Sequence, residues 1–151
     1  RFNFRGVGAS QGSHEGGRGE IDDVKAAASM LREKLGSDES EIIIAGYSFG
    51  AFVGSQYAAE DSGVDTCILI SPPLEHLDFD SLKTAAVNVL FISGDSDPFC
   101  ALPSLEGFQK GMTAQSSHLV ITGADHFFFG QDHMIVAHVA QFLKQRNKAD
   151  G

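Results

Sequence analysis

The stretch IIIAGYSFG, residues 42–50, decides the fold. Residues 41–46 form a short run that carries the β-branched Ile42, Ile43 and Ile44 and is typical of a strand buried in a parallel sheet. The glycine-flanked turn around Ser48 ends this run, and residues 49–60 then favour a helix. The stretch therefore predicts a strand, a sharp turn and a helix in direct succession.

The sequence on both sides of this stretch continues the alternation of strands and helices. The end of a strand is expected at residues 2–4, followed by a glycine-rich loop over residues 5–19. Further strands are expected over residues 66–70, 87–92 and 118–121, and helices over residues 20–35, 104–112 and 132–144. The first of these helices carries one apolar stripe, formed by Ile21, Val24, Ala28, Leu31 and Leu35. The alternation predicts one α/β domain over residues 1–151, with a mostly parallel sheet covered by helices on both faces.

The overall charge and the cysteine content restrict the partners and the setting. The formal net charge of −9 argues against a nucleic acid or an anionic membrane as partner, since both attract a basic surface. No apolar run is long enough to span a membrane. Cys67 and Cys100 are too few for a disulfide framework and lie at no metal-ligand spacing. We therefore expect a protein of the reducing cytoplasm that holds no metal.

Ser48 is the candidate nucleophile of the chain. It is the centre of GYSFG, residues 46–50, where a serine on a strained strand-to-helix turn leaves no room for side chains two positions before and after it. We therefore expect glycine to be required at both flanking positions. The following helix points its N-terminus at the site, so that the amide of Phe49 can donate a hydrogen bond to an oxyanion. The sequence GASQG, residues 8–12, fits the same pattern around Ser10 but leads into a loop, which excludes that serine.

Two later strand ends carry the other residue types that a nucleophilic serine needs. Active groups of parallel sheets gather at the carboxyl ends of the strands. The sequence GDSDP, residues 94–98, follows one predicted strand and offers Asp95 and Asp97, while His126 follows the last strand. The order serine, aspartate, histidine along the chain is the order that this kind of site uses. His126 is therefore the candidate base, with either aspartate as the acid that orients it; Asp125 ranks lower because it adjoins the histidine.

The remaining motifs have plainer interpretations. Of the other histidines, His14 and His76 are expected in solvated loops, and His138 is expected to pack on the apolar stripe of the last helix. His118 is expected within a strand and His133 within a helix. The sequence Gly6-Val7-Gly8 lacks the full spacing of a dinucleotide-binding loop, and no phosphate-binding lysine motif occurs. We therefore expect no cofactor, and we interpret the loop over residues 5–19 as a turn that borders the site.

Three motifs resemble those of the small bacterial-type α/β-hydrolases, a serine esterase-like family. They are RFNFRGVGASQG at residues 1–12, GYSFGA at residues 46–51 and GADHFF at residues 123–128. The resemblance covers essentially the whole chain. It implies hydrolysis of carboxylic esters or related small acyl compounds without a cofactor. It also implies Ser48 as nucleophile, His126 as base, Asp97 as acid with Asp95 as the alternative, and the Phe49 amide as one oxyanion donor.

The chain departs from the family at its front. Family members have further strands upstream, and the loop after their third strand, which supplies the second oxyanion donor, has no counterpart here. That third strand lies between the first two strands visible in this sequence. We therefore expect one of three outcomes: the opening strand pairs anew, a second copy of the chain pairs with the exposed sheet edge as a homo-oligomer, or the sequence is a fragment that lacks its N-terminal strands.

Three functional hypotheses follow from these residues. The first is an ester hydrolase in which Phe99, Phe127, Phe128 and Phe129 line an apolar acyl pocket, unless these side chains serve core packing instead. The second is an amide or peptide hydrolase that uses the same residues. The third is a truncated binding form without catalysis, whose incomplete sheet edge recruits a partner.

Overall fold

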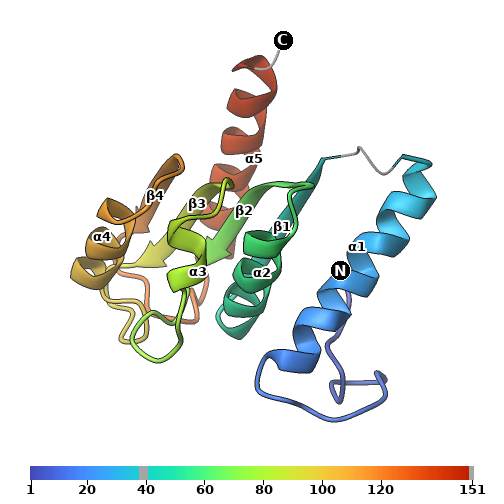
Figure 1. Ribbon diagram of the computed structural model, residues 1–151. Coiled ribbons are helices and arrows are strands. Elements are labelled where there is room, and N and C mark those ends of the chain that lie inside the picture. Colours follow the sequence, from blue (N-terminus) through green and yellow to red (C-terminus); the bar gives the residue numbers. More distant parts are fainter. Residues whose placement is uncertain (38–40, 150–151) are drawn as a thin grey trace.

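A computed structural model describes residues 1–37 and 41–149 of the chain. Its centre is a sheet of four parallel strands in the order β1-β2-β3-β4. The strands are β1 (Ile42–Tyr47), β2 (Val64–Ile70), β3 (Asn88–Gly94) and β4 (Ser116–Ile121). All strands point the same way, so their carboxyl ends form one edge of the molecule (Figure 1). This arrangement confirms the predicted parallel sheet.

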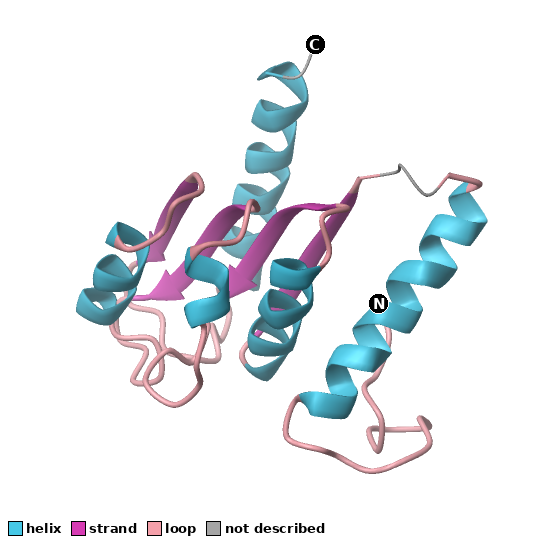
Figure 2. Cartoon of the chain, in the orientation of Figure 1, coloured by secondary structure: helices cyan, strands magenta, loops and turns pink. Residues whose placement is uncertain are grey.

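Helices cover both faces of the sheet, as predicted. They are α1 (Arg18–Leu35), α2 (Phe49–Glu60), α3 (Asp80–Lys83), α4 (Leu102–Lys110) and α5 (Asp132–Ala149). Figure 2 shows α2, α3 and α4 in front of the sheet, α5 behind it, and α1 beside α2. The helix α3 was not predicted, because a single turn is too short to show a helical repeat.

The two faces follow from the alternation of side chains along the strands. On one face, Cys67 and Leu69 of β2 pack with Val89 and Phe91 of β3 beneath α2 and α4. On the other face, apolar side chains of α5 pack against the alternate strand residues, which are Ile68, Leu90, Ile92 and Ile121. The central strands are apolar on both faces, which explains why β2 and β3 read as nearly continuous apolar runs in the sequence.

The predicted apolar stripe of α1 is buried only in its first half. Val24 and Ala28 are buried, whereas Leu31 and Leu35 are exposed. The helix packs against α2, and near its C-terminal end Arg32 still contacts Tyr57 and Asp61, while the apolar Leu31 and Leu35 stay exposed. The apolar pattern indicates which face of the helix can be buried, but it does not indicate whether a neighbouring element covers the whole length of that face.

The predicted opening strand is not formed. Residues 2–4 are irregular, and in the described part of the chain β2 is the one strand that pairs with β1. The ring of Phe4 instead lies edge-on to Phe2 and to Phe49. A strand needs a neighbour to satisfy its backbone groups, and residues 2–4 have none beside them in the sheet. The suggestion that the opening strand pairs anew with the sheet is therefore wrong.

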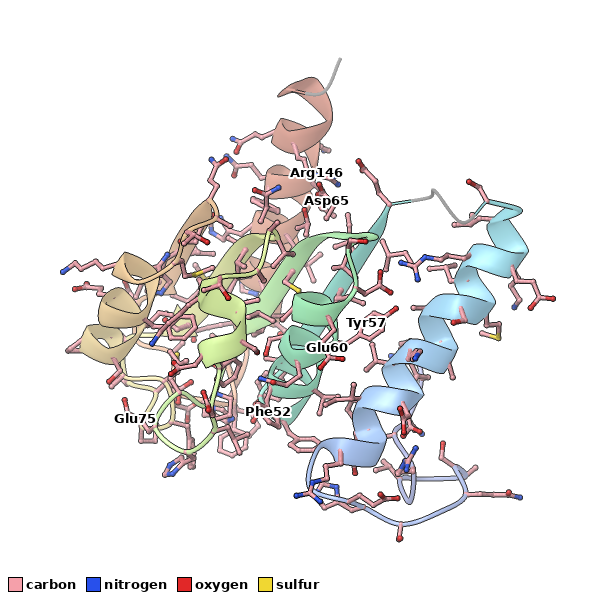
Figure 3. The ribbon with its side chains drawn as sticks, in the orientation of Figure 1. Phe52, Tyr57, Glu60, Asp65, Glu75 and Arg146 are labelled. Carbon is pink, nitrogen blue, oxygen red and sulfur yellow. The ribbon has the colours of Figure 1, made fainter. Side chains whose placement is uncertain are left out.

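The helix α5 runs from the carboxyl ends of the strands back to their amino ends. Near its C-terminal end, Arg146 forms ion pairs with Glu41, just before β1, and with Asp65 at the start of β2. Figure 3 shows Arg146 and Asp65 close together at the end of the sheet away from the strand tips. None of the helices in the described residues is both long enough and apolar enough to cross a membrane.

Candidate active site

Ser48 occupies a strained turn between β1 and α2. Its φ of 53° is positive, a conformation that non-glycine residues seldom adopt and that is concentrated at functional sites. Two sets of hydrogen bonds hold the turn. The Ser48 N–H donates to the carbonyl of Ile70, and the Ser48 carbonyl accepts from Ala51 and Phe52 at the start of α2. The strand and the helix therefore fix the backbone on both sides of the serine.

The two glycines that flank Ser48 differ in how tightly they are packed. A Cβ atom on Gly46 would lie 2.2 Å from the carbonyl oxygen of Gly50, so glycine is required at position 46 as predicted. A Cβ atom on Gly50 would meet nothing within 4 Å. The expectation that both positions need glycine was therefore wrong for Gly50, because that residue contributes its carbonyl to the close contact while its own Cβ direction is open.

The structure joins Ser48, His126 and Asp97 by hydrogen bonds. The Ser48 Oγ lies 2.9 Å from His126 Nε2, and His126 Nδ1 lies 3.1 and 3.0 Å from the two carboxylate oxygens of Asp97. His126 and Asp97 are both buried, and the Phe99 N–H also donates to Asp97 Oδ1. The three residues follow β1, β3 and β4, at the sheet edge where the sequence predicted them.

The other two aspartates of this region shape loops instead. Asp95 Oδ1 accepts hydrogen bonds from the Gly123 N–H and from the Ser96 hydroxyl. Asp125 Oδ1 accepts from the Phe127 N–H, two residues further along its own loop. Of the carboxylates that the sequence offered, Asp97 contacts His126, while Asp95 connects the loop after β3 to the loop after β4.

The loop over residues 5–19 lies against the start of α2, as expected for a loop that borders the site. The ring of His14 lies edge-on to Phe49, with ring centres 5.1 Å apart. Phe49 is the first residue of α2, and the amides of a first helical turn have no carbonyl partner within the helix. The Phe49 N–H next to Ser48 is thus available to a negatively charged oxygen.

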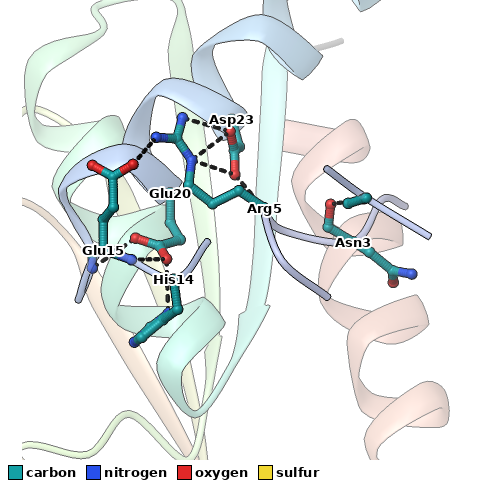
Figure 4. Close-up of polar contacts among 8 residues, drawn as sticks. Asn3, Arg5, His14, Glu15, Glu20 and Asp23 are labelled. Atoms are coloured by element: carbon teal, nitrogen blue, oxygen red, sulfur yellow. Dashed lines mark hydrogen bonds and ion pairs between the residues drawn. The ribbon is translucent and has the colours of Figure 1, made fainter. Parts of the chain in front are cut away.

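Ion pairs and backbone hydrogen bonds fix this loop (Figure 4). Arg5 binds Asp23 of α1 through its guanidinium and its own N–H, and it also pairs with Glu15. Glu20 is completely buried, accepts hydrogen bonds from the N–H groups of Glu15 and Gly17, and pairs with His14. Burial alone raises the pKa of a carboxyl, but these amides and His14 hold the pKa of Glu20 below its usual value.

Glu20 and Tyr47 are two features of this region that the sequence did not single out. Glu20 stands at the third position of α1, where a glutamate is a capping signal that could have indicated its hydrogen bonds. Tyr47 precedes Ser48, and its hydroxyl donates a 2.8 Å hydrogen bond to the backbone carbonyl of His126. Nothing in the sequence indicates that bond, because its two residues lie 79 positions apart.

The four phenylalanines that were expected to line a pocket divide into two groups. Phe128 is buried beneath the sheet among the residues that pack against α5. Phe99 and Phe127 are exposed and lie edge-on to the His126 ring, and the exposed Phe129 lies beside Phe127. Phe128 therefore follows the core-packing alternative that the sequence left open for these side chains.

Two further observations on the described residues concern Ser10 and a possible metal site. The hydroxyl of Ser10 donates to the carbonyl of Asn3 within an exposed loop. No group of three or more histidine, cysteine, aspartate or glutamate side chains in the described ranges is arranged to hold a metal ion.

Comparison with known proteins places the chain in a family. Residues 23–134 match the model of the alpha/beta hydrolase family, and the chain belongs to that family. The chain is 33% identical over 136 residues to an uncharacterized protein of Rickettsia prowazekii (strain Madrid E). That match covers 85% of this chain and 57% of the relative, so the chain spans little more than half the length of this curated relative.

Solved structures of serine hydrolases are also similar. An alpha-beta serine hydrolase homologue from Coxiella burnetii is 33% identical with a TM-score of 0.86, over 95% of this chain and 67% of the other. A serine hydrolase from Xanthomonas campestris, described as having no lid, is 30% identical with a TM-score of 0.85, over 96% of this chain and 65% of the other. The fold is thus that of the α/β hydrolases.

Proposed function

We propose that the protein is a serine hydrolase that cleaves carboxylic esters through an acyl-enzyme on Ser48. One observation carries the proposal: Asp97, His126 and Ser48 form a continuous line of hydrogen bonds that ends at a serine with a positive φ. The serine hydrolases from Coxiella burnetii and Xanthomonas campestris, which share the fold, support the same class of reaction.

The contacts give each residue a role in this reaction. The Ser48 hydroxyl attacks the ester carbonyl while His126 Nε2, 2.9 Å away, takes its proton. Asp97 accepts a hydrogen bond from Nδ1–H, which fixes the tautomer and stabilises the imidazolium. The N–H of Phe49 donates to the oxyanion of the tetrahedral intermediate. His126 then protonates the departing alcohol, and water repeats the sequence on the acyl-enzyme.

A second oxyanion donor decides how fast this reaction runs. We assign one donor, the Phe49 amide, and no second donor within this chain, which matches 57% of the length of the Rickettsia relative. Removing one oxyanion donor from a hydrolase costs about two to three orders of magnitude in rate. We therefore expect reaction with an activated phosphonate to be the most sensitive readout of this site, because it needs only an activated serine.

Labelling with a fluorophosphonate tests the proposal directly. The folded protein should be labelled at Ser48, and Ser48→Ala should abolish labelling and ester hydrolysis together. His126→Ala should reduce both by at least about a thousandfold, since the serine loses its base. The matched control is Ser10→Ala, which removes the other serine of the G-x-S-x-G pattern and should change neither. Absence of labelling in protein whose circular dichroism shows it to be folded would instead support the binding form without catalysis.

The acid is tested by a pair of isosteric substitutions. Asp97→Asn removes the charge that faces His126 and should lower kcat by about three to four orders of magnitude. Asp95→Asn keeps a carbonyl acceptor for the Gly123 amide and should have a much smaller effect on kcat. A larger loss from Asp95→Asn would show that the wrong acid is named here.

The preference for esters over amides needs its own comparison. An ester and an amide with the same acyl group and matched leaving groups should differ in kcat/KM, with the ester favoured. A faster reaction with the amide would support the amide or peptide hydrolase that the same three residues also permit.

A further inference from the structure

Two exposed phenylalanines, Phe99 and Phe127, lie beside the candidate base, and a third, Phe129, lies beside Phe127; we call these three side chains the aromatic rim. Their exposed fractions are 38%, 62% and 83%. Phe99 lies edge-on to the His126 ring at 4.7 Å, and Phe127 lies edge-on to it at 5.6 Å. Phe129 adjoins Phe127 at 5.8 Å. Large aromatic side chains that are exposed to solvent beside a candidate catalytic group indicate a binding surface.

The backbone of residues 127–129 leaves the rings of Phe127 and Phe129 exposed to solvent. Phe128 has a φ of 51°, which is strained for a bulky side chain. Its side chain is buried against the α5 side of the sheet, while Phe127 and Phe129 on either side of it remain exposed. The strained residue thus anchors the loop in the core and leaves its neighbours as an apolar surface beside His126.

The position of the rim around His126 indicates which part of the substrate it meets. When the tetrahedral intermediate collapses, the bond between the carbonyl carbon and the alcohol oxygen breaks, and the proton on His126 Nε2 passes to that oxygen. The alcohol oxygen must therefore come within hydrogen-bond reach of Nε2. The group attached to that oxygen then extends over the surface around the imidazole, which is formed by Phe99 and Phe127.

We propose that the aromatic rim binds the alcohol part of the ester and selects apolar alcohols, both alkyl chains and aromatic rings. The inference rests on the proposed ester hydrolysis and adds the substrate class to it. It replaces the expectation that the phenylalanines line an acyl pocket. A fully buried methylene improves binding by about fourfold, and the rim is open on one side, so we expect about twofold per methylene in kcat/KM.

Two series of esters test the proposal. In the first, the acyl group is acetyl and the alcohol is methyl, butyl, hexyl or benzyl. In the second, the alcohol is methyl and the acyl group is acetyl, butyryl or hexanoyl. We expect kcat/KM to rise by at least about tenfold from methyl to hexyl or benzyl acetate, and to change much less along the acyl series. A rise confined to the acyl series would overturn the proposal.

Substitutions locate the effect on the rim. Phe127→Ala and Phe129→Ala should each lower the ratio of kcat/KM for benzyl acetate to that for methyl acetate. Leu35→Ala, which removes an equally exposed apolar side chain at the end of α1, should leave the ratio unchanged. An unchanged ratio in both phenylalanine variants would contradict the proposal. Because the readout is a ratio of two kcat/KM values, it does not depend on the fraction of active protein.

A binding measurement gives a readout that needs no turnover. Benzyl alcohol and hexanol should slow the labelling of Ser48 by diisopropyl fluorophosphate, and Phe127→Ala should weaken this protection. If Ser48 is labelled and acetate esters are cleaved, but neither alcohol size nor added alcohol has an effect, the rim proposal alone fails. If Ser48 is neither labelled nor active in the folded protein, the proposed function fails and this inference fails with it.

Discussion

Single residues at the turn around Ser48 serve different purposes although they share one motif. Gly46 is required because the backbone of Gly50 fills the space of its side chain, whereas Gly50 has open space around it. Tyr47 connects this turn to the carbonyl of His126. The motif therefore contains one residue fixed by packing and one that holds a distant loop by a hydrogen bond.

The two glycines allow a matched pair of substitutions. Gly46→Ala should lower the free energy of unfolding by at least about 2 kcal/mol, because its Cβ overlaps backbone atoms that cannot move aside. Gly50→Ala should be tolerated and should raise the free energy of unfolding by up to about 1 kcal/mol, since alanine favours the helix. Urea unfolding measures both, and similar losses in the two variants would contradict the assignment.

Tyr47 is expected to position His126. Tyr47→Phe removes the hydroxyl alone, and we expect kcat to fall by about three- to tenfold with KM unchanged, which corresponds to the net strength of one hydrogen bond. Thr113→Val is a suitable control, because it removes a hydroxyl–carbonyl bond to Lys83 away from the site. Both variants should lose comparable stability, and only the tyrosine variant should lose activity; an equal kcat in the two would limit Tyr47 to a structural role.

At the scale of elements, α1 is attached to α2 by one cluster of polar side chains. Arg32 of α1 forms two hydrogen bonds, of 2.9 and 3.0 Å, with the carboxylate of Asp61 at the end of α2. Tyr57 points from α2 toward α1 in Figure 3, and its hydroxyl also donates to Asp61. This cluster lies beside the half of α1 whose apolar stripe is exposed, so charge holds the helix where apolar packing ends.

The cluster predicts a defined response to acid. The Arg32 guanidinium lowers the pKa of Asp61 from 3.8 to about 2. Because the folded pKa lies below the ordinary value, the stabilisation is complete above pH 3.8 and is lost as the pH falls toward 2. Asp61→Asn should therefore lower the free energy of unfolding by about 1 to 2 kcal/mol at neutral pH, discounted for partial exposure. It should also flatten the decrease of stability over that acidic range.

Acid and thermal unfolding followed by circular dichroism measure this effect. Asp80→Asn is the control, because its ion pair with Lys83 lies on an exposed turn and contributes little. An Asp61→Asn variant with the same acid sensitivity as the parent chain would contradict the role given to the cluster.

Elements differ in how far their sequence specifies them. The bounds of α2 agree with the prediction, and the four strands of the sheet agree within two residues, because each apolar run ends at glycine, proline or a polar turn. The expectation that the strand before Ser48 is buried was wrong, because β1 lies at one end of the strand order with Ile43 and Tyr47 exposed. The opening strand was predicted wrongly. The local pattern was present, but within the described residues no neighbouring strand lies beside residues 2–4.

The residues of the candidate site also differ in how far the sequence indicates them. Ser48, Asp97 and His126 are found from the sequence because each follows a strand and the order along the chain is informative. The contacts of Tyr47 and Glu20 involve backbone atoms, and a backbone partner carries no signature in the residue type. Sequence reasoning thus finds the three residues of the candidate site and misses the hydrogen bonds that hold the backbone around them.

At the scale of the whole molecule, the charge of the chain predicts a substrate preference. The formal net charge is −9, and the loops beside His126 present the exposed carboxylates of Asp95 and Asp125. An ester that carries a carboxylate should therefore react several-fold more slowly than its neutral isostere at low salt. The difference should shrink as the ionic strength rises from about 0.01 M to 0.1 M, since the screening length falls from about 30 to 10 Å.

Steady-state kinetics at several salt concentrations measure this preference. A cationic isostere serves as the control and should show the opposite trend. If the difference between the anionic and neutral esters does not depend on salt, local contacts and not the field of the whole molecule set the preference.

The course of α5 has a practical consequence for handling the protein. The helix leaves the sheet edge that carries Ser48 and His126, and near its far end Arg146 pairs with Asp65 at the opposite edge. An affinity handle, a fluorescent reporter or a sensor surface joined after this helix would therefore be held on the side away from Ser48. Immobilisation through that end should orient the molecules with their sites toward the solution, which random coupling through lysines cannot achieve.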